Sequence, residues 1–151
     1  MKTLKKLAPA LVLLLVVSFA NAQNNIDDYN RRLAERHEAI RIKSEELMKG
    51  GTENRNVYSS EMERSIVAAR RQHLEMHNRL SSQQLSMTQP YNEAIGKYHN
   101  NMIASNNSLK AELSKPQPNE TLVKQYSGQI NQSAVEAEQQ HEKMISTMGI
   151  K

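Results

Sequence analysis

Apolar residues recur along most of this chain at the spacing of one helical face, with polar residues between them. The clearest case is the set Ile26, Leu33, Ile40 and Leu47, which lie seven residues apart. This spacing keeps the four side chains on one side of a helix of about seven turns. Residues 50–51 are both glycine, and they are expected to end this helix because glycine readily adopts a left-handed conformation.

Three further helices are expected. The second would begin at Thr52 or, with a better cap, at Ser60, where Glu63 would complete a capping box. Pro90 is expected to break the pattern and open a third helix. Two prolines within residues 115–119 predict a linker to the last helix. The apolar faces of these helices are Met62, Ile66, Ala69, His73, Met76, Leu80 and Met87; Tyr91, Ile95, Tyr98, Met102, Leu109 and Leu113; and Val123, Tyr126, Ile130, Ala137, Met144 and Met148.

The pattern predicts an all-α protein, either an antiparallel helical bundle or an elongated helical hairpin assembly of about four helices. A closed bundle and an open cradle completed by a second copy share this pattern. The chain has no Trp and no Cys, and its one Phe lies near the N-terminus. Disulfides, thiolate metal sites and lipid anchors on cysteine are therefore excluded. The core must be modest, and we expect a homodimer to complete it.

The first 22 residues have the pattern of a secretory signal peptide. Lysines at positions 2, 5 and 6 precede an apolar run over residues 7–19, and Ala20 and Ala22 supply small residues at a cleavage site. The run is short for a membrane span, which needs about 20 residues. We expect cleavage after Ala22, a single all-helical domain over residues 23–151 and export to the periplasm or the extracellular space, without an integral membrane anchor.

Loss of this leader changes the charge. The full chain has 20 basic and 16 acidic residues, and three of the lysines lie in the leader. The remaining 17 basic residues almost balance the acids, so nucleic acid is not an expected partner. No sequence motif of a nucleophile, a phosphate loop or a zinc hydrolase is present, and the protein is expected not to be an enzyme.

Histidines and methionines are the candidate metal ligands. His73 and His77 lie four residues apart with Met76 between them, a spacing that lets two imidazoles and a thioether reach one zinc or copper ion. The alternative is that His73 interrupts an apolar stripe and His77 lies at its boundary. The other three histidines stand singly on other helices; they could converge in a bundle core, but the sequence does not show that they do: His37, His99 and His141.

Seven methionines follow the leader, most of them in phase with the core. They are either simply core residues or part of a flexible, polarizable surface suited to unfolded chains. A surface for client or partner proteins would comprise Met62, Met76, Leu80, Met87, Tyr91, Tyr98 and Met102.

Three short stretches, at residues 80–84, 85–89 and 113–117, read Leu-Ser-x-x-Gln. Together with the proline linker and the last helix, they make residues 80–148 resemble the Spy/CpxP-type periplasmic chaperones and the related periplasmic heavy-metal resistance proteins. Members of that family have Leu-Thr-x-x-Gln at helix starts. Here serine replaces threonine, and the late Leu-Thr-Pro-Glu-Gln motif is absent. The residues that carry over by motif, with a structural role, are Leu80, Gln84, Leu85 and Gln89.

The resemblance implies an ATP-independent chaperone or stress adaptor of the bacterial envelope, working as a dimeric helical cradle. The leading hypothesis is accordingly an exported, non-enzymatic binding protein that shields apolar segments of client proteins. The first alternative is a periplasmic metal-binding or metal-sensing protein with His and Met ligands. The second is a purely structural secreted bundle.

Overall fold

The computed structural model describes the backbone of residues 4–50 and 54–149, and the side chains within these ranges from Ile26 onward. Four helices make up almost all of it, and none of the described residues forms a strand. The helices are α1 (Leu4–Met48), α2 (Arg55–His77), α3 (Ser82–Leu113) and α4 (Glu120–Thr147). The all-α prediction is confirmed.

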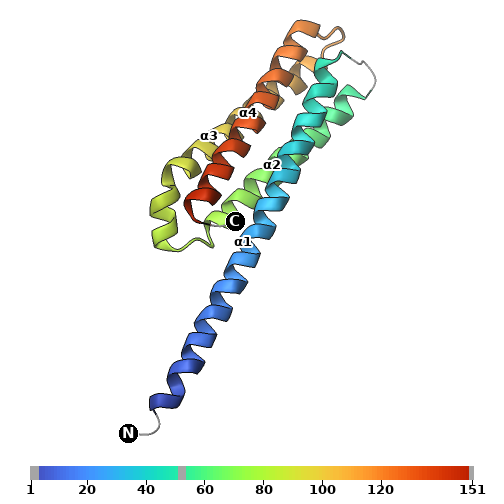
Figure 1. Cartoon of the computed structure of the whole chain (residues 1–151). Coiled ribbons are helices and arrows are strands. Elements are labelled where there is room, and N and C mark those ends of the chain that lie inside the picture. The colour runs from blue at the N-terminus through green and yellow to red at the C-terminus, as the bar shows by residue number, and fades with distance from the viewer. Residues whose placement is uncertain (1–3, 51–53, 150–151) are drawn as a thin grey trace.

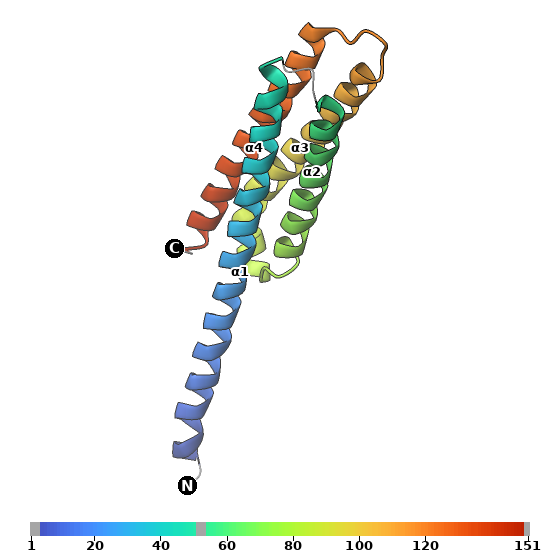
Figure 2. The same ribbon diagram turned by 90° about the vertical axis from the view of Figure 1, so that its right-hand side faces the viewer.

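The helices form a four-helix bundle in which successive helices run in opposite directions (Figures 1 and 2). Each helix packs against its neighbours in sequence, and α4 also packs against α1 to close the ring. Short connections between helices favour this antiparallel order. The structure therefore decides between the two arrangements left open by the sequence: one chain forms a closed bundle.

The first half of α1 projects beyond the other three helices (Figure 1). The predicted leader lies in this part, and its side chains are outside the described residues, so the leader stays a prediction. Over the residues described, none of the helices is long and apolar enough to cross a membrane.

The start of α2 differs from the prediction. The helix begins at Arg55, after Asn54, whose positive φ of 66° places it in the left-handed region. Ser60 therefore lies inside the helix and forms no cap, while Thr52 lies outside the described residues. Gly50, at the end of α1, also has a positive φ, of 84°, and α2 begins earlier than the capping pattern indicated.

The break between α2 and α3 also lies elsewhere than predicted. It falls just before Ser81, whose side chain accepts from the backbone N–H of Gln84 while the Gln84 side chain accepts from the backbone N–H of Ser81. This reciprocal capping box starts α3. Pro90 lies within α3 with an exposed side chain. The helix thus starts at the strong cap nine residues before the proline and continues through Pro90, although the proline has no N–H to donate. The first Leu-Ser-x-x-Gln copy is this cap, whereas the second lies inside the helix.

The core confirms the predicted apolar faces for the most part and consists of two clusters. Met87 was predicted on the face of the second helix, but it lies on α3 and is 46% exposed, because the helix break falls before it. The large apolar cluster lies toward the end of the bundle that carries the α1–α2 and α3–α4 connections, and the small apolar cluster lies toward the other end. The large cluster is Leu33, Ile40, Leu47, Met62, Ile66, Ala69, Met102, Leu109, Leu113, Val123, Ile130, Ala134 and Ala137. The small cluster is Ile26, Met76, Leu80, Ile95, Met144 and Ile145.

Polar contacts join the α1–α2 and α3–α4 connections at the end of the bundle next to the large cluster. The buried Arg55 side chain forms a bidentate ion pair with Glu120 at 2.6 and 2.7 Å and also donates to the Gly50 carbonyl. Asn119 caps α4 by accepting from two backbone N–H groups. These contacts hold the start of α2 against the start of α4, and the predicted linker over residues 115–119 is confirmed.

Candidate metal centre

Four histidines, one from each helix, are buried in the bundle core. Their exposed fractions are 1% for His37, 4% for His73, 0% for His99 and 3% for His141. A polar ring that could be solvated at the surface is costly to bury unless both ring nitrogens find partners. We call these four residues the histidine layer.

The histidine layer lies where the large apolar cluster gives way to the small one. On α2, α3 and α4 the histidine stands between a residue of the large cluster and a residue of the small cluster, three or four positions away in each direction. The flanking residues, with the large-cluster member first, are Ala69 and Met76 on α2, Met102 and Ile95 on α3, and Ala137 and Met144 on α4. Because these positions share the core-facing phase of each helix, the fold turns all the imidazoles inward.

The histidines contact one another and one methionine. The Nε2 atoms of His37 and His99 are 3.1 Å apart, and the rings of His73 and His99 lie edge to face with centroids separated by 5.8 Å. The His141 Nε2 atom lies 3.4 Å from the Sδ atom of Met76, which is 1% exposed. All four helices thus contribute nitrogen or sulfur donors to one region of the core.

The hydrogen bonding of this layer is incomplete. A neutral imidazole has one N–H donor and one bare nitrogen. His37 and His99 face each other through their Nε2 atoms, so one ring donates from Nε2 and the other accepts at Nε2. The accepting ring must then carry its proton on Nδ1. Neither Nδ1 atom has a hydrogen-bond partner among the described residues, and the same holds for Nδ1 of His73. At least one buried N–H is therefore left without an acceptor, which costs about 1–3 kcal/mol.

Burial keeps the rings neutral at physiological pH. It lowers the pKa of His37 and of His73 to about 4, that of His141 to about 3 and that of His99 to about 2. Repulsion by other histidines of the layer lowers the pKa of His37, His99 and His141 further. For His73 the repulsion comes from His77, and a hydrogen bond to the Asn92 backbone acts in the opposite direction. No carboxylate among the described residues contributes to these shifts. The layer is thus a set of neutral bases with free lone pairs, the form in which histidine binds metals.

The structure places only part of the predicted metal set in this layer. His73 and Met76 are buried beside the other histidines, but His77 is half-buried at the last position of α2 and outside the layer. Among the described residues, no three His, Asp or Glu side chains already surround a common point as an ion would require. The ring nitrogens are neighbours, and rotation of the rings would be needed to direct them at one centre.

A sequence signal for the layer was available. Each of the four helices carries one histidine in phase with its apolar face, at His37, His73, His99 and His141. Which of them meet depends on the relative shift of antiparallel helices, and helical periodicity does not contain that shift.

The predicted client surface is divided by the fold. Met62, Met76, Leu80 and Met102 are buried, whereas Met87 is 46% exposed. Tyr91 and Tyr98 are partly buried and pack against the core clusters. In this closed bundle, the seven residues do not form one accessible surface.

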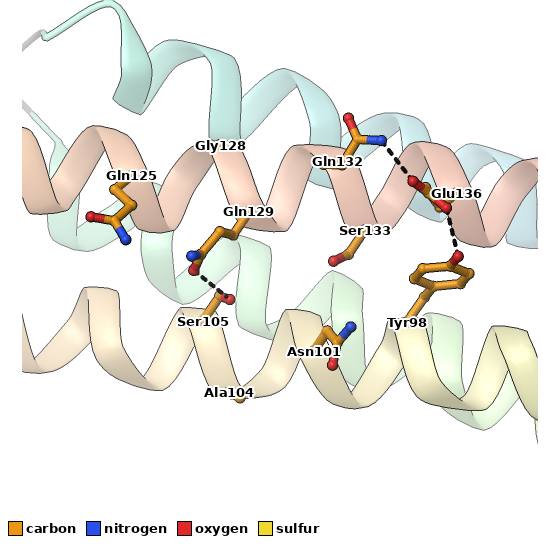
Figure 3. Close-up of a pocket in the computed structure, with 10 residues that line it drawn as sticks. All are labelled: Tyr98, Asn101, Ala104, Ser105, Gln125, Gly128, Gln129, Gln132, Ser133 and Glu136. Carbon is orange, nitrogen blue, oxygen red and sulfur yellow. Dashed lines mark hydrogen bonds between the residues drawn. The ribbon is translucent and has the colours of Figure 1, made fainter.

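A shallow groove of about 690 Å³ lies between α3 and α4 on the outside of the bundle (Figure 3). Its polar side chains bond mainly to one another. The Tyr98 hydroxyl and the Gln132 amide both donate to Glu136, at 2.5 and 2.8 Å, and Ser105 donates to Gln129 at 3.2 Å. The groove is thus an open helix–helix seam whose main polar groups bond to one another, in contrast to the buried histidine layer.

Comparisons with protein-family models, with curated proteins and with solved structures find no match for this chain. The function must therefore be argued from the site.

Proposed function

We propose that this protein binds a late first-row transition metal ion, copper or zinc, at the histidine layer. The observation that carries the proposal is the convergence of four buried neutral imidazoles, one from each helix, with three unpartnered ring nitrogens. Imidazole suits copper and zinc better than it suits magnesium or calcium. Bundle cores are also where four-helix proteins build metal sites from facing helices.

Donor separations support the proposal. Two nitrogen ligands on one tetrahedral ion lie about 3.3 Å apart when the metal–nitrogen bonds are about 2.0 Å long. The Nε2 atoms of His37 and His99 are already 3.1 Å apart. The His141 Nε2 and Met76 Sδ atoms, 3.4 Å apart, are close to the roughly 3.5 Å expected for a nitrogen–sulfur ligand pair with a metal–sulfur bond of about 2.3 Å.

Occupation would also change the hydrogen bonding of the layer. An ion would accept the lone pairs of two imidazoles that now share a single hydrogen bond. Each ligating ring then carries its proton on Nδ1, so the ligand rings must find acceptors there, and partners of this kind commonly fix metal-bound histidines. Small shifts that bring backbone carbonyls or water to these nitrogens are therefore part of the proposed bound state.

Calorimetry of the purified protein with Zn²⁺, Cu²⁺ and, without oxygen, Cu⁺ tests the proposal. We expect saturable binding of at least one ion at one per chain, tighter than micromolar. His99→Leu should abolish it, because His99 contacts both His37 and His73. His77→Ala is the matched control, since this histidine lies outside the layer.

Equal loss in both variants, or no binding of any of the three ions, would overturn the proposal. Circular dichroism of both variants separates loss of the ligand from loss of the fold.

The chaperone function stays a prediction. It would need the bundle to open, because four of the seven client-surface residues are buried in the closed form. Homodimer formation and export likewise stay predictions. Suppression of client aggregation, measured with and without chelator, tests whether opening occurs and whether it depends on metal.

A further inference from the structure

We propose that the histidine layer selects Cu⁺ over Zn²⁺ and that the Met76 thioether is a direct ligand together with His141. The inference rests on the proposed metal-binding function and names the ion that this function serves. Three features of the layer point to it: a soft donor in contact with a nitrogen donor, nearly complete burial, and no carboxylate among the described groups that act on the histidine pKa values.

Ligand softness is the first argument. Thioether sulfur binds Cu⁺ well and Zn²⁺ poorly, because Cu⁺ is the softer acid. Met76 is fully buried and its Sδ atom lies 3.4 Å from Nε2 of His141, so the sulfur faces the histidine layer. The contact places a soft sulfur donor and a nitrogen donor side by side in the core.

Charge is the second argument. The free energy needed to move an ion out of water rises with the square of its charge. Desolvation therefore costs about four times as much for a divalent ion as for a monovalent ion of similar size. Zinc sites offset this cost with thiolates, carboxylates or solvent. Cysteine is absent from the sequence, and no carboxylate among the described residues influences the pKa of any histidine of the layer. Arg70 lowers the pKa of His99 through its positive charge, and the same charge would repel a divalent ion more strongly than a monovalent one.

These arguments give a consistent ligand set. His141 and Met76 form one edge of the site, and His37 and His99, with their Nε2 atoms 3.1 Å apart, form the other. His73 packs on the His99 ring and orients it. All these ligands are neutral, so the bound site has the single positive charge of the ion.

The test compares Met76→Leu with Met62→Leu. Both methionines are fully buried, but Met62 belongs to the large apolar cluster, away from the histidines. Leucine conserves most of the methionine volume. Affinities for Cu⁺ are measured anaerobically by competition with a chromophoric Cu⁺ chelator, and affinities for Zn²⁺ by competition with a zinc indicator.

We expect the wild-type protein to bind Cu⁺ at least a hundredfold more tightly than Zn²⁺. Met76→Leu should weaken Cu⁺ binding at least tenfold, with little change for Zn²⁺, and Met62→Leu should change neither. Equal effects of the two substitutions on Cu⁺ would overturn the role of Met76. Zn²⁺ binding as tight as that of Cu⁺ would overturn the selectivity while leaving the proposed function intact. Failure of both ions to bind would overturn both proposals.

X-ray absorption at the copper edge of the wild-type protein gives a second readout that does not depend on a folded variant. A sulfur neighbour in the first coordination shell is the expected result. A shell of nitrogen and oxygen alone would overturn the assignment of Met76, since the sequence has no cysteine to supply sulfur.

Discussion

The large apolar cluster and the histidine layer occupy the same kind of position, the core-facing stripe of each helix, yet they differ in what they contribute. Residues such as Ile40 and Ile130 are completely buried and have no polar group to satisfy, so their burial stabilises the bundle at any pH. The histidines are buried equally well but leave ring nitrogens without partners. One region stabilises the fold at any pH. The stability of the other depends on protonation, and it is the region proposed to bind a metal ion.

The comparison shows why a buried imidazole is hard to explain as packing alone. Leucine or methionine would fill the same volume without a polar cost. Four such positions in one layer, one on every helix, amount to a sizeable loss of stability. A loss of this kind is often retained where the residues have a function.

Acidification should produce the largest difference between the two regions. The pKa of each histidine of the layer is about 4 or below when folded, against an ordinary value of 6.5. The unfolded chain therefore binds more protons, and stability falls as the pH drops below 6.5. Between pH 7.5 and 5, the four groups together should remove about 8 kcal/mol from the free energy of unfolding. Urea unfolding of the metal-free protein at several pH values measures this.

Acidic residues do not produce the same response. Burial raises the pKa of Glu138, so its protonation in the folded state opposes the effect of the histidines. Paired carboxylates such as Glu120 and Glu112 have lowered pKa values, so they lose their charge only below the window in question. An unfolding free energy that stays constant from pH 7.5 to 5 would contradict the burial of the layer.

Truncation in the large apolar cluster should have the next largest effect, and it should not depend on pH. Ile40→Ala removes a fully buried side chain and is expected to cost about 2–5 kcal/mol. Ile42→Ala, at a position that is 49% exposed on the same helix, is the control and should change stability by less than about 0.5 kcal/mol. Similar losses in the two variants would mean that the core is not where the structure places it.

Removal of the α3 cap should have a smaller effect. Ser81→Ala removes the hydroxyl that accepts from the backbone N–H of Gln84, while the Ser81 backbone N–H can still donate to the Gln84 side chain. The substitution should cost about 1 kcal/mol. Ser60→Ala, at the cap predicted from sequence, lies inside α2 and should be neutral or slightly stabilising because alanine favours helix. Thermal unfolding of the two variants compares the two cap positions directly, and a larger loss at Ser60 would favour the sequence prediction.

Paired removal of two histidines should have the smallest effect at neutral pH. His37→Leu with His99→Leu replaces both partners of the 3.1 Å contact by apolar groups, so stability at pH 7.5 should change by less than about 1 kcal/mol. The pH dependence should fall to about half, because two of the four buried imidazoles remain. A full wild-type pH dependence in this variant would assign the acid response to other groups.

Much of the fold followed from the sequence alone. The seven-residue spacing from Ile26 to Leu47 was enough to identify the buried face of α1, because helical periodicity is a local property. The linker over residues 115–119 was equally clear, since proline cannot continue a helix. The apolar faces of α3 and α4 were predicted for the same reason.

The predicted starts of two helices were wrong. A capping pattern at Ser60 and a proline at Pro90 both indicated boundaries, but the chain begins α2 at Arg55 and α3 at Ser82. Arg55 gains a partly buried ion pair with Glu120, 65 residues away, and such a long-range contact outweighs a single cap.

The sequence by itself determined that the protein is helical, free of cysteine and equipped with one histidine on the buried face of each helix. The tertiary structure alone decided that those histidines meet, that His77 stays outside and that Met76 joins them. Periodicity fixes the face on which a side chain lies, but the height at which antiparallel helices align comes from packing across the whole bundle, and that height brings the four imidazoles into one layer.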